Sequence, residues 1–519
     1  MTAPSPEVAF ELPDGYDATA PWNYDPMHFP RPLPMLGQET LRAVNQNAFG
    51  LETAFAHGYA FTKNLAPPPP TPEVLEKGVV RIWEEDFVPS IEEFCRRIRT
   101  TDWDSLSAEE LASRVPALIN EAGDIFRYTM IVVFPFMGPT LHLVEYSEQV
   151  LGPDGPLLIA SLLQGYANAT QAAGEGLGEL TALAAKLPAV SQALRDGKFD
   201  SLSSVQGGSE FLKALDAYLA DFGWRVDDWA QLHVPTWAEN PASPLRMIGA
   251  YLAGDTGTPD ASIRRAKELR DAAEVDLKSR ISGESLAEIL GMLEVARPHV
   301  AMSEGRARWQ LTIVGSLRAP VMALGRKLRA AGALADANDA FYLTSDELLA
   351  AAKAPSPATI QLVEQRKRDL EFSHTLQPPP FLGAAPDMAG APPEVQSVFR
   401  RFFGLGIVPS EDASLVTGYA ASGGVARGRA RIIRSLDDAD RLEPGDVLVC
   451  TLTAPPWTPL FAIASAVVTD TGGVLSHSGI CAREFAIPCV VGTQVGTSAI
   501  PDGAFITVDG DKGTVQIER

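Results

Sequence analysis

Helical periodicity dominates the middle of the chain. From residue 72 to about residue 371, apolar residues recur every three or four positions, a spacing that places them on one face of an α-helix. One such helix has Ser209 as its predicted cap and Gly223 as its stop. Its apolar face consists of Phe211, Leu212, Leu215, Leu219 and Phe222. The pattern predicts a mainly α-helical domain over residues 72–375.

The pattern changes towards the C-terminus, where short β-branched runs alternate with glycine turns and short helical stretches. This alternation predicts a compact α/β domain over residues 411–519. The stretch from Asp509 to Gly513 is similar to a calcium-binding loop but lacks the later glutamate, so we predict a turn between two strands. The predicted strands are 430–433, 447–449, 466–468, 489–491 and 505–508.

Proline marks the boundaries between these regions. The run from Pro67 to Pro72 cannot lie inside a helix and ends a proline- and aromatic-rich segment, residues 1–71, which we expect to pack on the helical domain. Residues 376–410 begin with a stretch rich in proline, glycine and alanine, a composition typical of an irregular linker. The predicted fold is therefore multidomain, with a helical domain followed by an α/β domain.

The amino-acid composition argues against several kinds of partner. The 519 residues carry a formal net charge of −22, which argues against a nucleic-acid partner because such partners need a cationic surface. The four cysteines show no CxxC pair, so we predict reduced thiols, no protein-bound metal and a cytoplasmic location. The apolar run from Thr129 to Leu143 is short and interrupted by proline, so no membrane partner is expected.

The main chemical signal is a histidine between Thr471 and Gly492. His477 follows the glycine pair Gly472 and Gly473 and opens a predicted helix. Imidazole titrates near neutral pH, so its unprotonated form can attack phosphorus and then carry a phosphoryl group. A helix N-terminus presents unpaired N–H groups to an anion. We therefore predict that His477 is the catalytic residue.

Five neighbours of His477 are predicted to contact the phosphoryl group. Gly472 and Gly473 allow the backbone to approach a phosphate, and Ser476 and Ser478 can cap the helix or donate hydrogen bonds to phosphoryl oxygens. Arg483 has two interpretations, a cation near the phosphoryl group or the docking surface, or a salt bridge that fixes the helix. The sequence leaves both open.

The segment resembles the mobile phosphohistidine domain of the phosphoenolpyruvate-utilising enzymes. That family includes pyruvate phosphate dikinase, phosphoenolpyruvate synthase, rifampicin phosphotransferase and phenylphosphate synthase. Further motifs extend the resemblance over about a hundred residues, in the family's order: Gly418, 422–431, 444–449, 457–460, 501–503 and 508–515. In the family, an ATP-grasp module phosphorylates the histidine, and the mobile domain then swings to an acceptor site.

The resemblance also predicts the partners. The first four hundred residues are mostly helical and no GxxxxGK[ST] signature occurs, so we expect ATP and its Mg²⁺ to bind a separate ATP-grasp subunit. Few residues follow the histidine domain, so no pyruvate-binding barrel is expected. The helical region more loosely resembles the acceptor domains of rifampicin phosphotransferases, and a separate ATP subunit is typical of the phenylphosphate synthase type.

The predicted reaction transfers the β-phosphate of ATP to His477 and then to a small aromatic hydroxyl compound, phenol or an alkylphenol. The products are an aryl phosphate, AMP and phosphate. Two alternatives remain: a phosphotransferase for a larger hydroxylated compound such as a rifamycin, and a phosphocarrier or regulatory binding protein without catalytic activity.

Acceptor residues are harder to identify. A helix predicted from about Glu304 to Ala331 would place Glu304, Arg308 and Arg318 within one arc if it is straight, either as a solvated charged face or as a docking site for phosphate. Phe134 and Phe136, with Phe126 and Tyr128 nearby, are predicted to form either a flat apolar pocket for a phenol ring or ordinary core. The sequence does not rank the remaining histidines as general bases.

Overall fold

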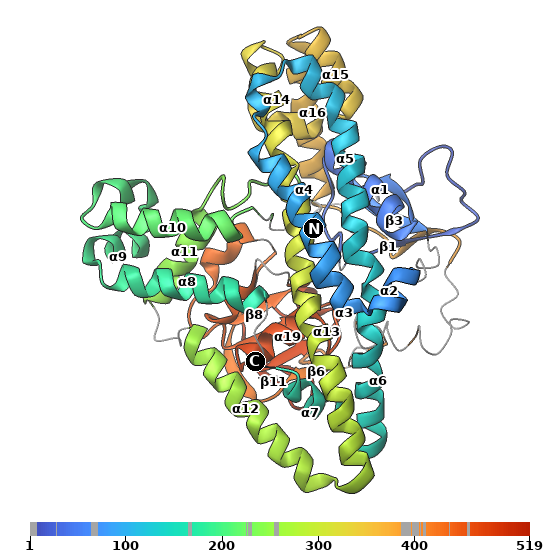
Figure 1. Ribbon diagram of the computed structural model, residues 1–519, viewed down its shortest axis with the longest axis vertical. Helices are drawn as coiled ribbons and strands as arrows, with labels where there is room; N and C mark the ends of the chain where they lie inside the picture. Colours follow the sequence, from blue (N-terminus) through green and yellow to red (C-terminus); the bar gives the residue numbers. More distant parts are fainter. Residues whose placement is uncertain are drawn as a thin grey trace, which may run out of the picture. The chain divides into compact units, whose positions relative to one another are not determined.

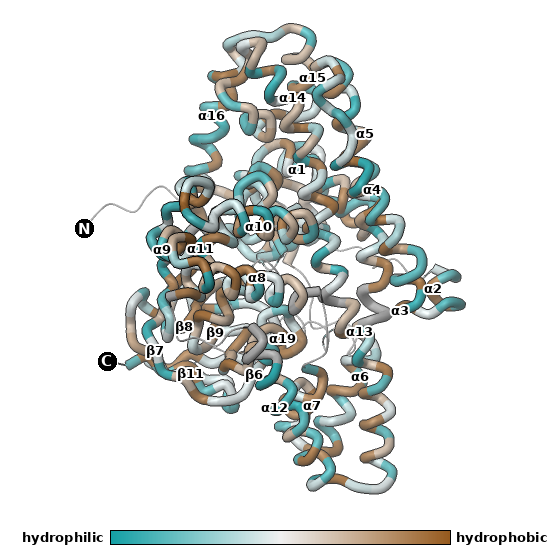
Figure 2. Tube along the Cα trace, turned by 60° about the vertical axis from the view of Figure 1, so that its left-hand side comes forward, coloured by the Kyte–Doolittle hydropathy of each residue, from teal (hydrophilic) through white to brown (hydrophobic). Residues whose placement is uncertain are grey.

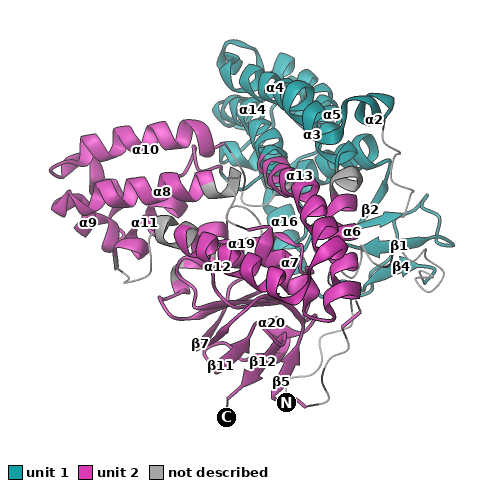
Figure 3. Ribbon diagram, turned by 60° about the horizontal axis from the view of Figure 1, so that its bottom comes forward, with its two compact units in different colours: residues 1–133, 228–235, 309–390 teal, residues 134–227, 236–308, 391–519 magenta. Residues whose placement is uncertain are grey.

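The computed structural model (Figure 1) consists of two compact units, which Figure 3 shows in different colours. Unit 1 contains residues 1–133, 228–235 and 309–390, and unit 2 contains residues 134–227, 236–308 and 391–519. Both units are thus assembled from segments that are distant in sequence. The structure describes residues 8–26, 28–63, 71–164, 169–224, 226, 231–253, 259–385, 396, 404, 406–407, 410, 412–434, 436–453 and 457–518.

Unit 1 contains a four-stranded antiparallel sheet with the order β2-β3-β1-β4. A two-residue turn joins β2 to β3, in which His57 and Gly58 both have positive φ angles, 50° and 79°, as this type of hairpin requires. Trp22 and Phe61 are fully buried in the core of this sheet. The strands are β1 (Pro21–Tyr24), β2 (Glu52–Ala56), β3 (Tyr59–Lys63) and β4 (Phe381–Gly383).

The strand β4 lies within residues 376–410, which the sequence predicted to be an irregular linker. That prediction was wrong for β4, because its backbone pairs with β1, with Trp22 opposite Leu382. The pairing joins segments about 360 residues apart, and composition alone carries no sign of it. Residues 386–395 of the predicted linker and the prolines at 67–70 lie outside the described residues.

The helices of unit 1 begin with local signals that the sequence contains. Ser107 caps α5 in a capping box with Glu110, and Thr344 caps α15 in the same way with Glu347. Helix α1 packs against α5. The helices are α1 (Met35–Val44), α2 (Pro72–Lys77), α3 (Val79–Ile82), α4 (Val88–Thr100), α5 (Ala108–Ile131), α14 (Arg318–Ala330), α15 (Ser345–Lys353) and α16 (Ala358–Ser373).

The helix predicted between residues 304 and 331 is not one straight helix. Helix α13 (Gly283–Ser316) ends before Leu317, and α14 begins at Arg318. Pro320 explains the break, because it has no N–H group to bond to the carbonyl of Ser316. The predicted stop is confirmed, since α14 ends at Ala330 and Gly332 adopts a φ of 76°.

Unit 2 contains the other helices of the middle region. Helix α10 was predicted correctly to end at Gly223, but its cap is Gly207, with a φ of 80°, and not Ser209. The helices are α6 (Val133–Leu151), α7 (Gly155–Leu162), α8 (Ala169–Ala185), α9 (Pro188–Arg195), α10 (Gly208–Phe222), α11 (Ala242–Ala253) and α12 (Pro259–Arg280), with most of α13.

An eight-stranded mixed sheet forms the C-terminal part of unit 2, in the order β5-β12-β11-β7-β8-β9-β10-β6. The strands β7 to β10 are parallel, and β8 and β9 are buried along their whole length and strongly hydrophobic (Figure 2). All five predicted strands are confirmed, as is the turn from Asp509 to Gly513. The strands are β5 (Leu415–Thr417), β6 (Tyr419–Ser422), β7 (Val425–Ile432), β8 (Val447–Cys450), β9 (Ala466–Thr469), β10 (Cys489–Val491), β11 (Phe505–Asp509) and β12 (Thr514–Ile517).

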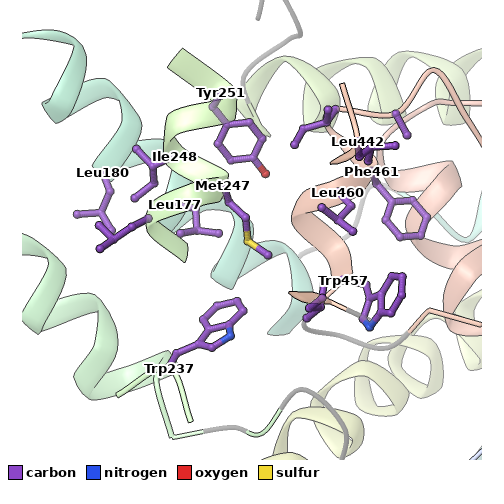
Figure 4. Packing of buried hydrophobic residues seen from close by; sticks show 14 of the residues in the cluster. Leu177, Leu180, Trp237, Met247, Ile248, Tyr251, Leu442, Trp457, Leu460 and Phe461 are labelled. Carbon is purple, nitrogen blue, oxygen red and sulfur yellow. The ribbon is translucent and has the colours of Figure 1, made fainter. Parts of the chain in front are cut away.

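One apolar cluster joins the helices α8 to α11 to the sheet region within unit 2 (Figure 4). Tyr251 of α11 donates a hydrogen bond from its hydroxyl to the carbonyl of Pro459, at 3.0 Å, in the short helix α18 (Thr458–Phe461). Trp457 and Phe461 lie in the same cluster. The C-terminal region therefore shares its core with these helices.

The general layout, helical regions followed by a C-terminal α/β region, is confirmed. The compact units divide the chain differently from the predicted domains, so a separate mobile domain at 411–519 stays a prediction. In the described part of the chain, no helix is both long enough and apolar enough to span a membrane.

Candidate functional site

His477 lies where a strand of the parallel sheet leads into a crossover helix. The strands β9 and β10 are parallel, so the chain must cross over between them, and helix α19 (His477–Glu484) does so. The loop 470–476 follows the carboxyl end of β9, the sheet edge at which α/β proteins usually bind ligands. His477 is the first residue of α19 and its side chain is half-buried.

Ser476 and Ser478 have separate roles on either side of the histidine. Ser476 is the N-cap of α19, and its Oγ accepts a hydrogen bond from the backbone N–H of Gly479 at 3.4 Å. Ser478 is buried, and its Oγ lies 2.8 Å from the Oγ1 of Thr453. Of the two predicted roles for Ser476, the structure therefore contains the cap.

The two glycines shape the turn that precedes the histidine. Gly472 has a φ of 94°, and a Cβ atom at this position would lie 2.8 Å from the Oγ of Ser476. The carbonyl of Gly473 accepts a hydrogen bond from the backbone N–H of Ser476 at 3.0 Å. Glycine is thus required at position 472 because the loop passes close to Ser476, the N-cap of α19. The predicted approach of Gly472 to a phosphate stays a prediction.

A buried carboxylate anchors the start of this loop, a feature that sequence reasoning missed. Asp470 accepts hydrogen bonds from the backbone N–H of Thr497 at 3.0 Å and from the Oγ1 of Thr493 at 3.1 Å. Burial raises the pKa of Asp470, and these hydrogen bonds act in the opposite direction. In the sequence, the only local signal for this anchor was that Asp470, a polar residue, directly follows the strand β9.

The side chain of Arg483, near the end of α19, is buried. Its Nη1 donates hydrogen bonds to the carbonyls of Ala421, at 2.6 Å, and Val474, at 2.9 Å. Burial lowers the pKa of Arg483 to about 10, which leaves the guanidinium charged at neutral pH. These contacts favour the interpretation in which Arg483 fixes the helix, although the acceptors are two carbonyl groups and not an acidic side chain.

Cys481 touches the histidine ring and was not among the predicted site residues. Its Sγ lies 3.3 Å from Nε2 and 3.7 Å from Nδ1 of His477. The spacing of four residues puts both side chains on one face of α19. This spacing was visible in the sequence, but cysteine at such a position is also an ordinary core residue.

The predicted acceptor residues Arg308 and Arg318 belong to different compact units. Arg308 belongs to unit 2, where it donates to the carbonyl of Asp221 at 3.2 Å and lies over the ring of Phe222. Arg318 belongs to unit 1, so the break before α14 removes the predicted common arc. The side chains of Phe134, Phe136 and Glu304 lie outside the described residues.

Arg318 is almost fully buried and engaged within unit 1. Its Nη1 donates to the carbonyl of Leu232 at 2.6 Å, its Nη2 donates to Asn338, and its guanidinium lies over the ring of Phe341. The contact with Leu232 holds residues 231–235, which separate two segments of unit 2 in the sequence, within unit 1. Arg318 therefore has a clear structural role, and a contact with phosphate stays a prediction.

The aromatic residues near Phe134 have ordinary packing roles. Phe126 is fully buried in α5, and the ring of Tyr128 stacks on Phe87 with centroids 4.7 Å apart. Among the other histidines, His233 has a buried Nδ1 that makes no hydrogen bond among the described residues. Burial, with smaller effects from Arg31 and Arg318, lowers the pKa of His233 to about 4.

Comparison with known protein families assigns the region that contains His477. Residues 442–513 match the mobile domain of PEP-utilising enzymes. The region around His477 is therefore similar to the mobile domain of this enzyme family. Residues 128–304, which include the helices α7 to α12, match the fourth domain of rifampicin phosphotransferase.

Individual proteins are also similar to this chain. The chain is 32% identical to the chondramide synthase of Chondromyces crocatus over 454 residues, 84% of this chain and 12% of the synthase. It is 31% identical to an uncharacterised phosphotransferase of Bacillus subtilis over 332 residues, 61% of this chain and 38% of that protein. It is 33% identical to the rifampicin phosphotransferase of Streptomyces sviceus over 331 residues, 62% of this chain and 36% of that enzyme. The chain thus spans little more than a third of the phosphotransferases it matches.

Proposed function

We propose that this protein is a phosphotransferase that carries a phosphoryl group on His477. The observation that carries the proposal is the position of this histidine within the mobile-domain region, at the first residue of a capped helix and only partly buried. The helix start offers backbone N–H groups and the positive end of its dipole to the phosphoryl oxygens. A neutral imidazole nitrogen supplies the attacking electron pair.

In the first half-reaction, a nitrogen of His477 forms a bond to the β-phosphorus of ATP, and the bond to the α-phosphate oxygen breaks, which releases AMP. Water then removes the γ-phosphate as inorganic phosphate and leaves one phosphoryl group on the ring. We expect MgATP to bind an ATP-grasp module on a separate subunit. The net charge of −22 supports this expectation, because a partner's cations would offset the unfavourable field of this chain.

In the second half-reaction, the phosphoryl group passes from His477 to an acceptor hydroxyl. The N–P bond breaks, an O–P bond forms, and the hydroxyl proton passes to a base. The acceptor oxygen must lie about 3 to 3.5 Å from phosphorus and in line with the breaking bond. We propose that the C-terminal region swings between the ATP-binding partner and the acceptor site, a movement that requires it to leave the apolar cluster that it shares with the helices α8 to α11.

Two acceptor classes fit this proposal. A phenol or alkylphenol ionises more readily than an alcohol and requires little help from a base. A larger hydroxylated compound of the rifamycin type is supported by the match of residues 128–304 to the rifampicin phosphotransferase fourth domain. One assay separates them, with phosphohistidine-labelled protein and a panel that contains phenol, alkylphenols and rifamycins.

The first test is labelling with ATP that carries radioactive β-phosphate, in cell extract as the source of the ATP-binding partner. We expect acid-labile, base-stable label on the wild type and none on His477→Ala. His142→Ala is the matched control, since His142 is an exposed histidine of α6, and it should label like the wild type. An unlabelled wild type, in an extract shown to contain the functional ATP-binding partner, would refute the carrier mechanism.

The labelled protein also tests the non-catalytic alternative. Transfer of the label to a hydroxyl compound identifies a phosphotransferase and its acceptor class. Stable label that moves to no member of the panel favours a phosphocarrier or regulatory binding protein. Addition of a purified ATP-grasp protein in place of extract then tests whether the partner is a separate polypeptide.

A further inference from the structure

We infer that the thiol of Cys481 is a positioning residue that holds the imidazole ring of His477 and selects the tautomer that takes up the phosphoryl group. This inference rests on the proposed function and extends it to a second side chain at the same site. The observation is the direct contact between the two side chains, with Sγ 3.3 Å from Nε2 and 3.7 Å from Nδ1.

The thiol is well placed for this role because it is itself fixed. Cys481 is only 1% exposed, and it belongs to the apolar cluster that joins α18 and α19 to the sheet. Its Sγ also lies 3.8 Å from the Oγ1 of Thr458, the buried first residue of α18. His477 is half-buried, so its ring rests against a fixed group while part of the side chain remains exposed.

The contact matters for the chemistry because the two ring nitrogens are not equivalent. A neutral imidazole has one N–H group and one lone pair, and only the nitrogen with the lone pair can attack phosphorus. A thiol either donates its S–H to a ring nitrogen or accepts from a ring N–H, and each arrangement favours one tautomer. The nearer nitrogen is Nε2, so the contact with Cys481 biases which nitrogen is the nucleophile.

The competing explanation is that Cys481 only fills space in the core, as a small apolar residue would. Alanine removes the sulfur, and serine restores a group that can form a hydrogen bond. Cys489 is the matched control, since it is a fully buried thiol of the same cluster and lies on β10. Cys489→Ala therefore reports the general effect of a lost thiol in this core.

Two measurements test the inference. In protein with ¹⁵N-labelled histidine, the imidazole signals of His477 are assigned by their loss in His477→Ala, and their shifts report the tautomer. We expect Cys481→Ala to change these shifts and Cys489→Ala to leave them unchanged. In single-turnover labelling, we expect Cys481→Ala to slow phosphorylation of His477 about fivefold at saturating ATP, the size of a weak hydrogen bond, and Cys481→Ser to recover at least half of the rate.

The two arms fail separately. If Cys481→Ala matches Cys489→Ala in both the ¹⁵N shifts and the labelling rate, the thiol is core filler and the inference is wrong. If the shifts change but the rate does not, the contact sets the tautomer without serving the transfer, which also overturns the inference. If the wild type takes no label, the proposed function fails, while the ¹⁵N shifts still decide whether Cys481 sets the tautomer.

Discussion

Replacement of Arg483 by methionine distinguishes a structural arginine from one that contacts phosphate. Methionine keeps most of the length of the side chain and removes the two hydrogen bonds from Nη1 to the carbonyls of Ala421 and Val474. Hydrogen bonds from a charged donor contribute about 1.5 to 3 kcal/mol each. The variant also avoids the cost of burying a charge, so we expect a net loss of about 3 kcal/mol in the local stability of α19.

Hydrogen exchange followed by mass spectrometry measures this loss directly. A loss of about 3 kcal/mol in the free energy of local opening makes exchange in peptides that cover α19 about a hundredfold faster. The control is Arg429→Met, since Arg429 is exposed on β7 over the ring of Phe505, and its loss should change exchange little. The reasoning is refuted if Arg483→Met exchanges like the control yet loses the phosphohistidine label, because the guanidinium would then serve the phosphoryl group.

Two further substitutions test the loop and unit 1. Gly472→Ala combines a positive φ of 94° with a contact of 2.8 Å to the Oγ of Ser476, so we expect a loss of about 2 to 3 kcal/mol and slower labelling of His477. Gly503→Ala is its control, since it has a φ of 84° but open space around the added Cβ, and equal effects of the two would contradict the proposed clash. His233 has its pKa lowered to about 4 from an unfolded value of 6.5, so the unfolded state binds more protons between these values and stability falls as the pH drops through them. We therefore expect the free energy of unfolding, measured in urea, to fall from pH 7 to pH 5 by about 1 to 2 kcal/mol less in His233→Gln than in the wild type. An equal fall in both proteins would show that His233 does not cause the pH dependence.

Local patterns predicted the elements around the histidine because each depends on neighbours in sequence. The buried strands β8 and β9 are short β-branched runs, and the start of α19 follows from Ser476 as its cap. The break before α14 was also available from the sequence, since Pro320 removes a hydrogen bond four residues earlier. The prediction of one straight helix gave more weight to apolar periodicity than to this proline.

The contacts that decide the roles of the side chains were not available, because their partners are distant in sequence. Arg483 donates to a carbonyl 62 residues away, and Ser478 pairs with a hydroxyl 25 residues away. A sequence indicates which groups can form hydrogen bonds, but only the fold selects the partner. Both residues were therefore assigned as possible phosphate contacts before the structure assigned them internal partners.

These internal partners bear on how the phosphoryl charge is balanced. The guanidinium of Arg483 already bonds to two carbonyls, and the hydroxyl of Ser478 is buried against Thr453. The helix start still offers positive potential at His477, and this potential is weaker than that of a full charge. A carrier with this arrangement would stabilise the charge of the phosphoryl group only weakly and would rely on cations at each docking site. Weak stabilisation suits a group that must leave the histidine again.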